Sequence, residues 1–320
     1  MSSLIEQAAL RLEQLRQAGV AIPEIASDLP PAPKAAAPAI AVPNAAAAAA
    51  ETKPDPAALS RRIDLNLDTI AAAGIVTPNA PRTRLADQYR VIKRPLIANA
   101  MGRGAATITH ANLIMVTSAV AGEGKSFTSI NLAMSIAAEL DHTVMLVDAD
   151  VARPSVLRML GLPPGPGLLE MLEGKAEMAN VLLRTNVDKL TILPSGSPHP
   201  KATELLASDA MKALLDDMAT RYPDRIIIFD SPPLLLTTES RVLATHMGQI
   251  VIVVRADETL QSTVNQALTT IEACPVKMVV LNQARSDAVG TYGSGYGYGY
   301  GYGEGYGYGQ APAAEPAAKT

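Results

Sequence analysis

Six short apolar runs, separated by segments with helical patterning, constrain the fold of this chain more than any other feature. The runs are LIMVTSA at 113–119, TVMLVDA at 143–149, LTILPSG at 190–196, RIIIFD at 225–230, IVIVVRA at 250–256 and KMVVLN at 277–282. Helical stretches at 125–140, 203–221 and 259–273 lie between them. Apolar strands that alternate with helices indicate a parallel sheet covered on both faces. The sequence therefore predicts a mostly parallel, doubly wound α/β sheet that binds its ligand at the carboxyl ends of the strands.

The segments that flank this α/β region differ from it in composition. Residues 1–18 have the pattern of a short amphipathic helix, with capping-box spacing between Ser3 and Glu6, which would either fray or dock on another surface. Residues 19–59 are rich in Pro and Ala and predict an extended linker. Residues 60–287 form the predicted globular domain, and residues 288–320 form a predicted flexible tail rich in Tyr and Gly.

Bulk properties exclude several classes of protein. The net charge of −4 gives no support for a nucleic-acid partner, which favours a strongly basic domain. Cys274 is the single cysteine, so the chain has no intrachain disulfide framework and fits a reducing compartment. The N-terminus lacks the pattern of a signal peptide, and no apolar run has the length of roughly 18 residues that a membrane span needs. These features predict a cytoplasmic protein.

The strongest motif is SAVAGEGKSFTSINLA at 118–133, between a predicted strand and a predicted helix. It matches the phosphate-binding loop of P-loop NTPases, with Ala119 in place of the first Gly. Lys125 would bind the β- and γ-phosphates, and the Ser126 hydroxyl would ligate Mg²⁺. An ordinary glycine-containing turn is the alternative interpretation. The predicted nucleotide-contacting residues are Ala121, Gly122, Glu123, Gly124, Lys125, Ser126 and Phe127.

Carboxylates follow two of the predicted strands. MLVDADVARP at 145–154 supplies Asp148 and Asp150, and IIIFDSPPLL at 226–235 supplies Asp230 after four apolar residues. Each Asp alone would also fit a helix cap, but carboxylates at strand ends beside a P-loop predict Mg²⁺ binding. We expect Ser126, Asp148 and Asp230 to be the metal ligands. The residues up to this point predict an ATP- or GTP-binding protein and no specific reaction.

The tail is unusual because it places tyrosines on a glycine string. Considered alone, such a segment favours a low-complexity linker or an aromatic segment that associates with itself. Seven of the nine tyrosines of the chain lie there: Tyr292, Tyr296, Tyr298, Tyr300, Tyr302, Tyr306 and Tyr308.

Taken together, these motifs resemble the bacterial tyrosine kinases of exopolysaccharide assembly, in particular the stand-alone tyrosine autokinases of exosortase (PEP-CTERM) loci. The resemblance covers roughly residues 80–310 and rests on GEGKS, VDADVARPS, TELLAS, IIIFDSPPLL, IVIVVRADET and the tyrosine-rich tail. The chain departs from the family pattern at Ala121, where Pro is usual, and at Ala152, where many members have Arg. An oligomerisation helix of relatives is present only as Asp87, Arg90 and Lys93.

The resemblance implies an ATP- and Mg²⁺-dependent autokinase that phosphorylates its own tail tyrosines, between subunits, to regulate exopolysaccharide polymerisation or export. It implies catalytic roles for Lys125, Asp148, Asp150 and Asp230, with Asp150 as proton acceptor. The implied partners are further copies of the chain, arranged as a ring, a membrane chain-length or co-polymerase activator that recruits it to the inner face of the membrane, and a tyrosine phosphatase.

Two other functions stay open at this point. One is a ParA/MinD-like P-loop ATPase that acts as a switch or a partner-binding module without kinase activity. Val120 argues against it, because ParA/MinD-like proteins carry a lysine at that position, five residues before the lysine of the loop. The other is a structural subunit of a polysaccharide complex that binds ATP without turnover.

Overall fold

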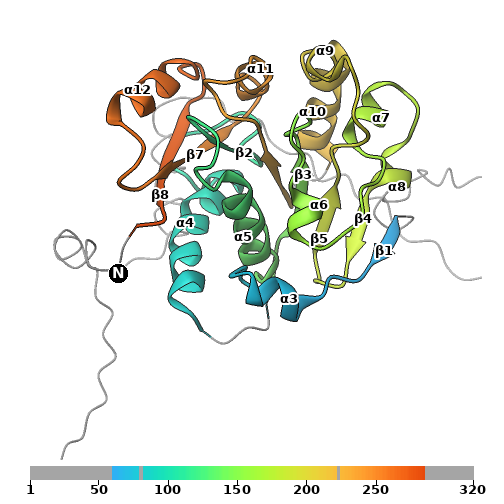
Figure 1. The fold of residues 1–320 in the computed structure, drawn as a ribbon, viewed down its shortest axis with the longest axis horizontal. Helices are drawn as coiled ribbons and strands as arrows, with labels where there is room; N and C mark the ends of the chain where they lie inside the picture. Colours follow the sequence, from blue (N-terminus) through green and yellow to red (C-terminus); the bar gives the residue numbers. More distant parts are fainter. Residues whose placement is uncertain (1–59, 79–81, 222–223, 285–320) are drawn as a thin grey trace, which may run out of the picture. The chain divides into compact units, whose positions relative to one another are not determined.

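The computed structural model describes residues 60–78, 82–221 and 224–284, and these residues contain an eight-stranded sheet (Figure 1). The strands lie in the order β1-β4-β5-β3-β6-β2-β7-β8. Every neighbouring pair is parallel except β4 with β5, which is antiparallel. The strands are β1 Arg61–Ile63, β2 Leu113–Ser118, β3 Thr143–Asp148, β4 Leu183–Thr185, β5 Leu190–Leu193, β6 Arg225–Asp230, β7 Gln249–Arg255 and β8 Val276–Asn282.

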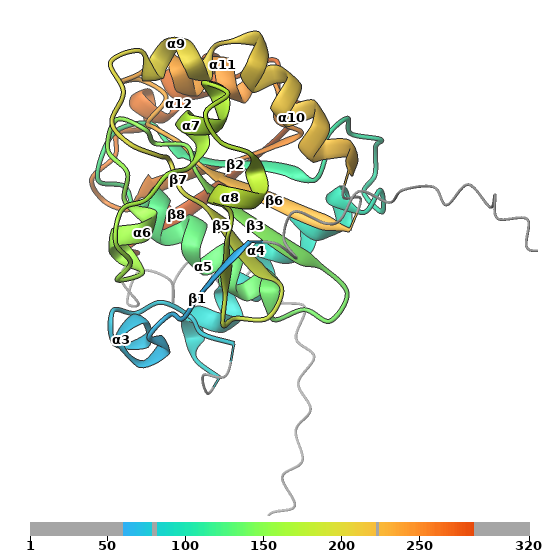
Figure 2. The same cartoon turned by 90° about the vertical axis from the view of Figure 1, so that its right-hand side faces the viewer.

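Helices cover both faces of the sheet, as Figure 2 shows. Residues of α3, α4, α5 and α6 share one buried cluster with alternate strand residues, and residues of α7 and α9 to α12 share the other. The helices are α3 Leu67–Ala72, α4 Arg84–Ala100, α5 Lys125–Ala137, α6 Val156–Met159, α7 Leu168–Leu172, α8 Met178–Val181, α9 Ala202–Leu206, α10 Asp209–Arg221, α11 Glu239–Ala244 and α12 Gln261–Thr269.

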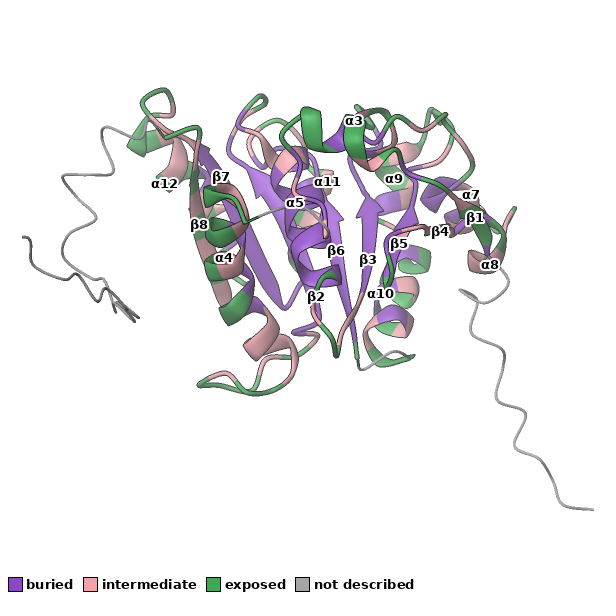
Figure 3. Ribbon diagram, turned by 90° about the horizontal axis from the view of Figure 1, so that it is seen from below, coloured by how far each residue is buried: buried purple, intermediate pink, exposed green. Residues whose placement is uncertain are grey.

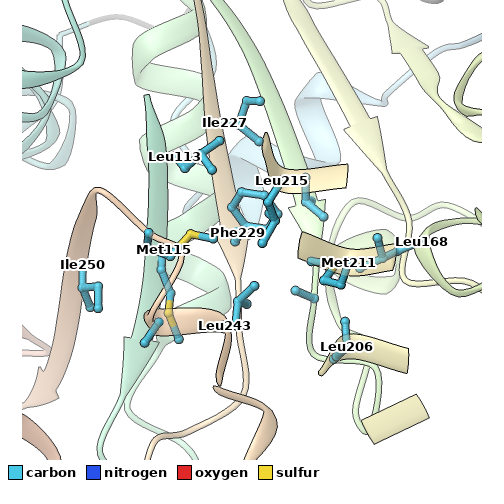
Figure 4. Close-up of a cluster of buried hydrophobic side chains, with 14 of the residues drawn as sticks. Leu113, Met115, Leu168, Leu206, Met211, Leu215, Ile227, Phe229, Leu243 and Ile250 are labelled. Atoms are coloured by element: carbon cyan, nitrogen blue, oxygen red, sulfur yellow. The ribbon is translucent and has the colours of Figure 1, made fainter. Parts of the chain in front are cut away.

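The central strands are buried on both faces, which explains why their sequences are apolar throughout (Figure 3). Successive residues of β6 point into different clusters, so that Ile228 packs on the α5 side and Phe229 on the α10 side. Phe229 lies among Met115, Leu215 and Leu243 in the second cluster (Figure 4). The parallel pairing of β2 and β3 with β6 places the carboxyl ends of these strands side by side.

The doubly wound α/β architecture predicted from the sequence is confirmed, and each of the six apolar runs overlaps a strand. The short strands β1 and β4 lacked a long apolar run and were not predicted. The helical stretch predicted at 203–221 is present as two helices, α9 and α10. Ser208 ends the first by donating to the Leu205 carbonyl and starts the second by accepting from Met211 N–H. The helix predicted at 1–18, the linker at 19–59 and the tail at 288–320 lie outside the described residues.

Helix α4 carries the three charged residues that resemble the family's oligomerisation motif. Arg90 pairs with Asp87 on the exposed side of the helix. Lys93 is buried, donates to the Ser135 carbonyl at 2.5 Å and pairs with Glu139 at 2.6 Å. Lys93 therefore ties α4 to α5, and only Asp87 and Arg90 of this trio remain on the surface. Across the residues that the structure describes, no helix combines the length and the apolar character needed to cross a membrane.

Candidate active site

The phosphate-binding loop connects β2 to α5 at the carboxyl edge of the sheet. Gly122 and Gly124 have φ angles of 86° and 92°, which glycine adopts without the steric cost that a side chain would add. A Cβ atom at Gly124 would also collide with the Asn282 amide, which donates to the Glu123 carbonyl at 2.9 Å. The loop thus depends on glycine for its conformation and on β8 for support. The first N–H groups of α5 have no partner within the helix and lie at its N-terminus, an arrangement that binds phosphate.

Glu123 stabilises this loop through hydrogen bonds of its side chain. Its carboxylate accepts from Val120 N–H at 2.8 Å and from the Thr259 hydroxyl at 2.6 Å, with a longer contact of 3.4 Å from Arg255 N–H. The residue is only 2% exposed. Glu123 is one of the residues predicted to contact nucleotide, and its side chain braces the loop against the end of β7. At the position of the ParA/MinD lysine, Val120 provides the N–H group for this brace.

Lys125 and Asp150 form a buried ion pair at the first turn of α5. Their Nζ and Oδ2 atoms are 2.6 Å apart, with 13% and 5% of the two side chains exposed. Burial alone would lower the pKa of Lys125, but the negative charges of Asp230 and Asp150 outweigh it and raise the pKa above its ordinary value. Lys125 is therefore cationic at neutral pH. A phosphate that binds the loop would compete with Asp150 for this ammonium group and leave the carboxylate free to accept a proton.

Asp148 and Asp230 lie deeper, at adjacent positions on β3 and β6. Asp148 accepts from Ser155 N–H and Val156 N–H through Oδ2, at the start of α6. Asp230 accepts from the Ser129 hydroxyl at 3.1 Å. The remaining oxygens, Asp148 Oδ1 and Asp230 Oδ2, are buried and have no hydrogen-bond partner. Burial, with the nearby charge of Asp230, raises the pKa of Asp148 to about 7, and burial also raises the pKa of Asp230.

Two buried carboxylate oxygens without partners fit a hard divalent cation, because such oxygens are costly to bury unless they are protonated or ligated. The Ser126 hydroxyl accepts from Ser155 at 2.8 Å, which places a further oxygen at the first turn of α5. Within the described ranges, no group of three or more His, Cys, Asp or Glu side chains is arranged to hold a metal. This donor set suits Mg²⁺, which commonly takes one or two carboxylates and fills its shell with phosphate and water oxygens.

A cavity of about 570 Å³ is lined by Lys125, Ser126 and Asp150, whereas Asp148 and Asp230 are not among its lining residues. Of the seven residues predicted to contact nucleotide, all except Glu123 line it, and of the three carboxylates predicted to be catalytic only Asp150 lines it. The sequence analysis did not identify Ser155 and Arg158, although the quoted box VDADVARPS already contained Ser155 beside the acidic pair. The cavity is also lined by Ala152, Arg153, Met159, Pro232, Pro233, Leu236 and Thr237.

The ParA family model, described as "NUBPL iron-transfer P-loop NTPase", matches residues 109–283 of the chain. The tyrosine-protein kinase CpsD of Streptococcus agalactiae serotype Ia is 31% identical over 185 residues, which are 57% of this chain and 78% of CpsD. The chain belongs to the bacterial tyrosine-kinase family of P-loop NTPases.

Further comparisons agree with this family. The tyrosine-protein kinase YwqD of Bacillus subtilis is 28% identical over 221 residues, covering 68% of this chain and 90% of YwqD. The chain matches a smaller part of longer family members, such as 24% of the length of Ptk from Acinetobacter johnsonii. Among solved structures, the kinase domain of VpsO is similar with a TM-score of 0.51 and 26% identity, over 63% of this chain and all of that domain. The family resemblance noted in the sequence is therefore confirmed.

Proposed function

We propose that this protein is an ATP-dependent protein-tyrosine autokinase that phosphorylates its own C-terminal tyrosine cluster. The observation that carries the proposal is the cavity in which Lys125 and Asp150 meet at the phosphate-binding loop. The buried carboxylate oxygens of Asp148 and Asp230 that have no hydrogen-bond partner support it. Named relatives that are tyrosine-protein kinases support the same reaction. The seven tail tyrosines provide the acceptors within the same chain.

The proposed transfer moves the γ-phosphoryl group of ATP to a tyrosine hydroxyl. The bond between the γ-phosphorus and the bridging oxygen breaks, a bond between phosphorus and the phenolic oxygen forms, ADP leaves, and the phenolic proton passes to Asp150. Mg²⁺, held by Ser126, Asp148 and Asp230, would neutralise charge on the phosphates. Lys125 and the loop N–H groups would hold the phosphates in place, which supplies most of the catalysis in phosphoryl transfer.

We propose that the tail brings a tyrosine to an active site. A glycine-rich segment of 15 residues has an r.m.s. span of roughly 20 Å, which suits transfer within one chain and transfer between chains. The family favours transfer between subunits of an oligomer. Each phosphate adds about −1.5 to −2 charge, so seven would add roughly −10 to −14. We propose that this charge repels the tails from the carboxylate-rich site and loosens the oligomer. A tyrosine phosphatase would then remove the phosphate groups and reverse the effect.

In the cell, this cycle would regulate exopolysaccharide polymerisation or export through a membrane co-polymerase partner that recruits and activates the kinase. If fully phosphorylated and dephosphorylated samples have the same oligomeric size by light scattering, the proposal that phosphorylation loosens the oligomer is wrong. The kinase activity is tested separately.

Incubation of the purified chain with Mg-ATP, followed by phosphotyrosine detection and mass spectrometry of the tail, tests the kinase activity. Lys125→Met is expected to abolish labelling, and a chain that ends at Asp287 is expected to lose most of it. Lys212→Met is the matched control, because Lys212 is exposed on α10 and does not line the cavity. Labelling of Lys125→Met at the wild-type rate would refute the mechanism.

The second candidate function is a P-loop ATPase switch without kinase activity, which the match to the ParA family model favours. The same incubation separates the two functions. A switch would hydrolyse ATP and release inorganic phosphate without labelling any tyrosine, and a structural subunit would bind ATP without turnover.

A further inference from the structure

Leu236 is a large apolar side chain left in solvent at the edge of the candidate active site. It is 60% exposed and lines the same cavity as Lys125 and Asp150. The preceding residues Pro232 and Pro233 are buried and also line that cavity. An exposed leucine on its own is ordinary. This one is unusual because the chain around it is held firmly in place.

Hydrogen bonds tie the turn that carries Leu236 to the base of the phosphate-binding loop. Leu234 N–H donates to the Ser118 carbonyl at 2.8 Å, and Leu235 N–H donates to the Ala119 carbonyl at 3.2 Å. Leu236 N–H closes the turn by donating to the Pro233 carbonyl at 3.3 Å. The leucine is therefore presented at a fixed position relative to the loop, and its exposure does not arise from a loosely attached segment.

The lining of the cavity combines polar and apolar side chains. Lys125, Ser126 and Asp150 supply the polar groups that the phosphates and the proton require. Pro233, Leu236 and Met159 supply an apolar surface within the same cavity. A tyrosine side chain has matching chemistry, with an apolar ring and one hydroxyl at its end. Leu236 follows β6, the strand that ends in Asp230, and so belongs to the side of the loop that holds the carboxylates.

We infer that Leu236, Pro233 and Met159 form the acceptor subsite, which holds the ring of the incoming tyrosine with its hydroxyl toward Asp150. This inference rests on the proposed kinase function and adds the surface that selects the acceptor. An apolar surface accounts for a preference for tyrosine over serine, because a serine side chain has no ring to bury against it. It also suits the tail, since glycine neighbours leave the tyrosine ring as the main apolar group that can bind.

The test uses the full-length chain with serine at the seven tail tyrosines, so that the tail does not compete, and a synthetic peptide with the sequence of residues 295–309 as acceptor. Initial rates of peptide phosphorylation are measured by mass spectrometry against peptide and ATP concentrations. Leu236→Ser is expected to raise the KM for the peptide about tenfold, equivalent to roughly 1.4 kcal/mol, with kcat within about twofold. Leu236→Met keeps the apolar surface and is expected to restore the wild-type KM.

Leu140→Ser is the matched control, because Leu140 is 85% exposed beyond the far end of α5 and does not line the cavity. A peptide KM that is the same for Leu236→Ser and for the unsubstituted enzyme would overturn the inference while leaving the kinase intact. An increase in the KM for ATP alone would also overturn it, because the leucine would then contact the nucleotide. Absence of any tyrosine labelling by the wild-type chain would instead refute the kinase function and the subsite with it.

Discussion

Replacement of Glu123 by alanine tests whether this residue supports the phosphate-binding loop or contacts the nucleotide. The carboxylate accepts two short hydrogen bonds, from Val120 N–H at 2.8 Å and from Thr259 at 2.6 Å, in a site that is 2% exposed. A hydrogen bond to a charged group contributes about 1.5–3 kcal/mol, and the substitution leaves both donors without their partner. We expect Glu123→Ala to lower the free energy of unfolding by about 3–5 kcal/mol.

Urea unfolding followed by circular dichroism measures this loss, and magnesium and ATP are omitted so that ligand binding does not contribute. Glu123→Gln keeps one acceptor oxygen and is expected to lose about half as much. Glu258→Ala is the control, because the Glu258 side chain is 58% exposed and such surface ion pairs contribute little. If Glu123→Ala unfolds within about 1 kcal/mol of the wild type while its KM for ATP rises, the bracing role is wrong and nucleotide contact is correct.

Three further predictions concern the pH response, the loop backbone and the helix contact. Burial raises the pKa of Asp148 from 3.8 to about 7, so the folded state binds its proton more tightly than the unfolded state does. Without metal, the free energy of unfolding is therefore expected to fall as pH rises from about 4 to about 7. The contribution of Asp148 to this fall is at most about 1.4 kcal/mol per pH unit. Urea unfolding across this range checks it, and an equally steep slope in Asp148→Asn would contradict it. Gly124→Ala is expected to cost about 2–3 kcal/mol, because φ is 92° and the new Cβ would collide with Asn282, whereas a melting temperature within about 2 °C of the wild type would refute the strain. Lys93→Ala is expected to lower the free energy of unfolding by about 3 kcal/mol, and Arg90→Ala by less than about 0.5 kcal/mol. Urea unfolding measures both losses, and equal losses for the two variants would contradict the burial of Lys93.

Much of the site was predictable because its signals are local. The phosphate-binding loop is one continuous segment, and Asp148 and Asp230 each follow an uninterrupted apolar run. In a parallel sheet, the carboxyl ends of such runs share one edge, so the sequence was enough to predict that these groups converge. The bracing contact of the Glu123 side chain with Thr259 was not predictable in the same way, because it joins residues 136 positions apart.

The sequence by itself determined the sheet, the nucleotide loop, its acidic neighbours and the family, because strand periodicity and loop motifs depend on residues close together in the chain. Only the tertiary structure decided that Lys93 is buried in the domain, that Ser155 donates to Ser126, and that Leu236 is exposed beside the cavity. These outcomes depend on which distant backbone and side-chain groups satisfy one another's hydrogen bonds. A single sequence carries no direct record of that pairing.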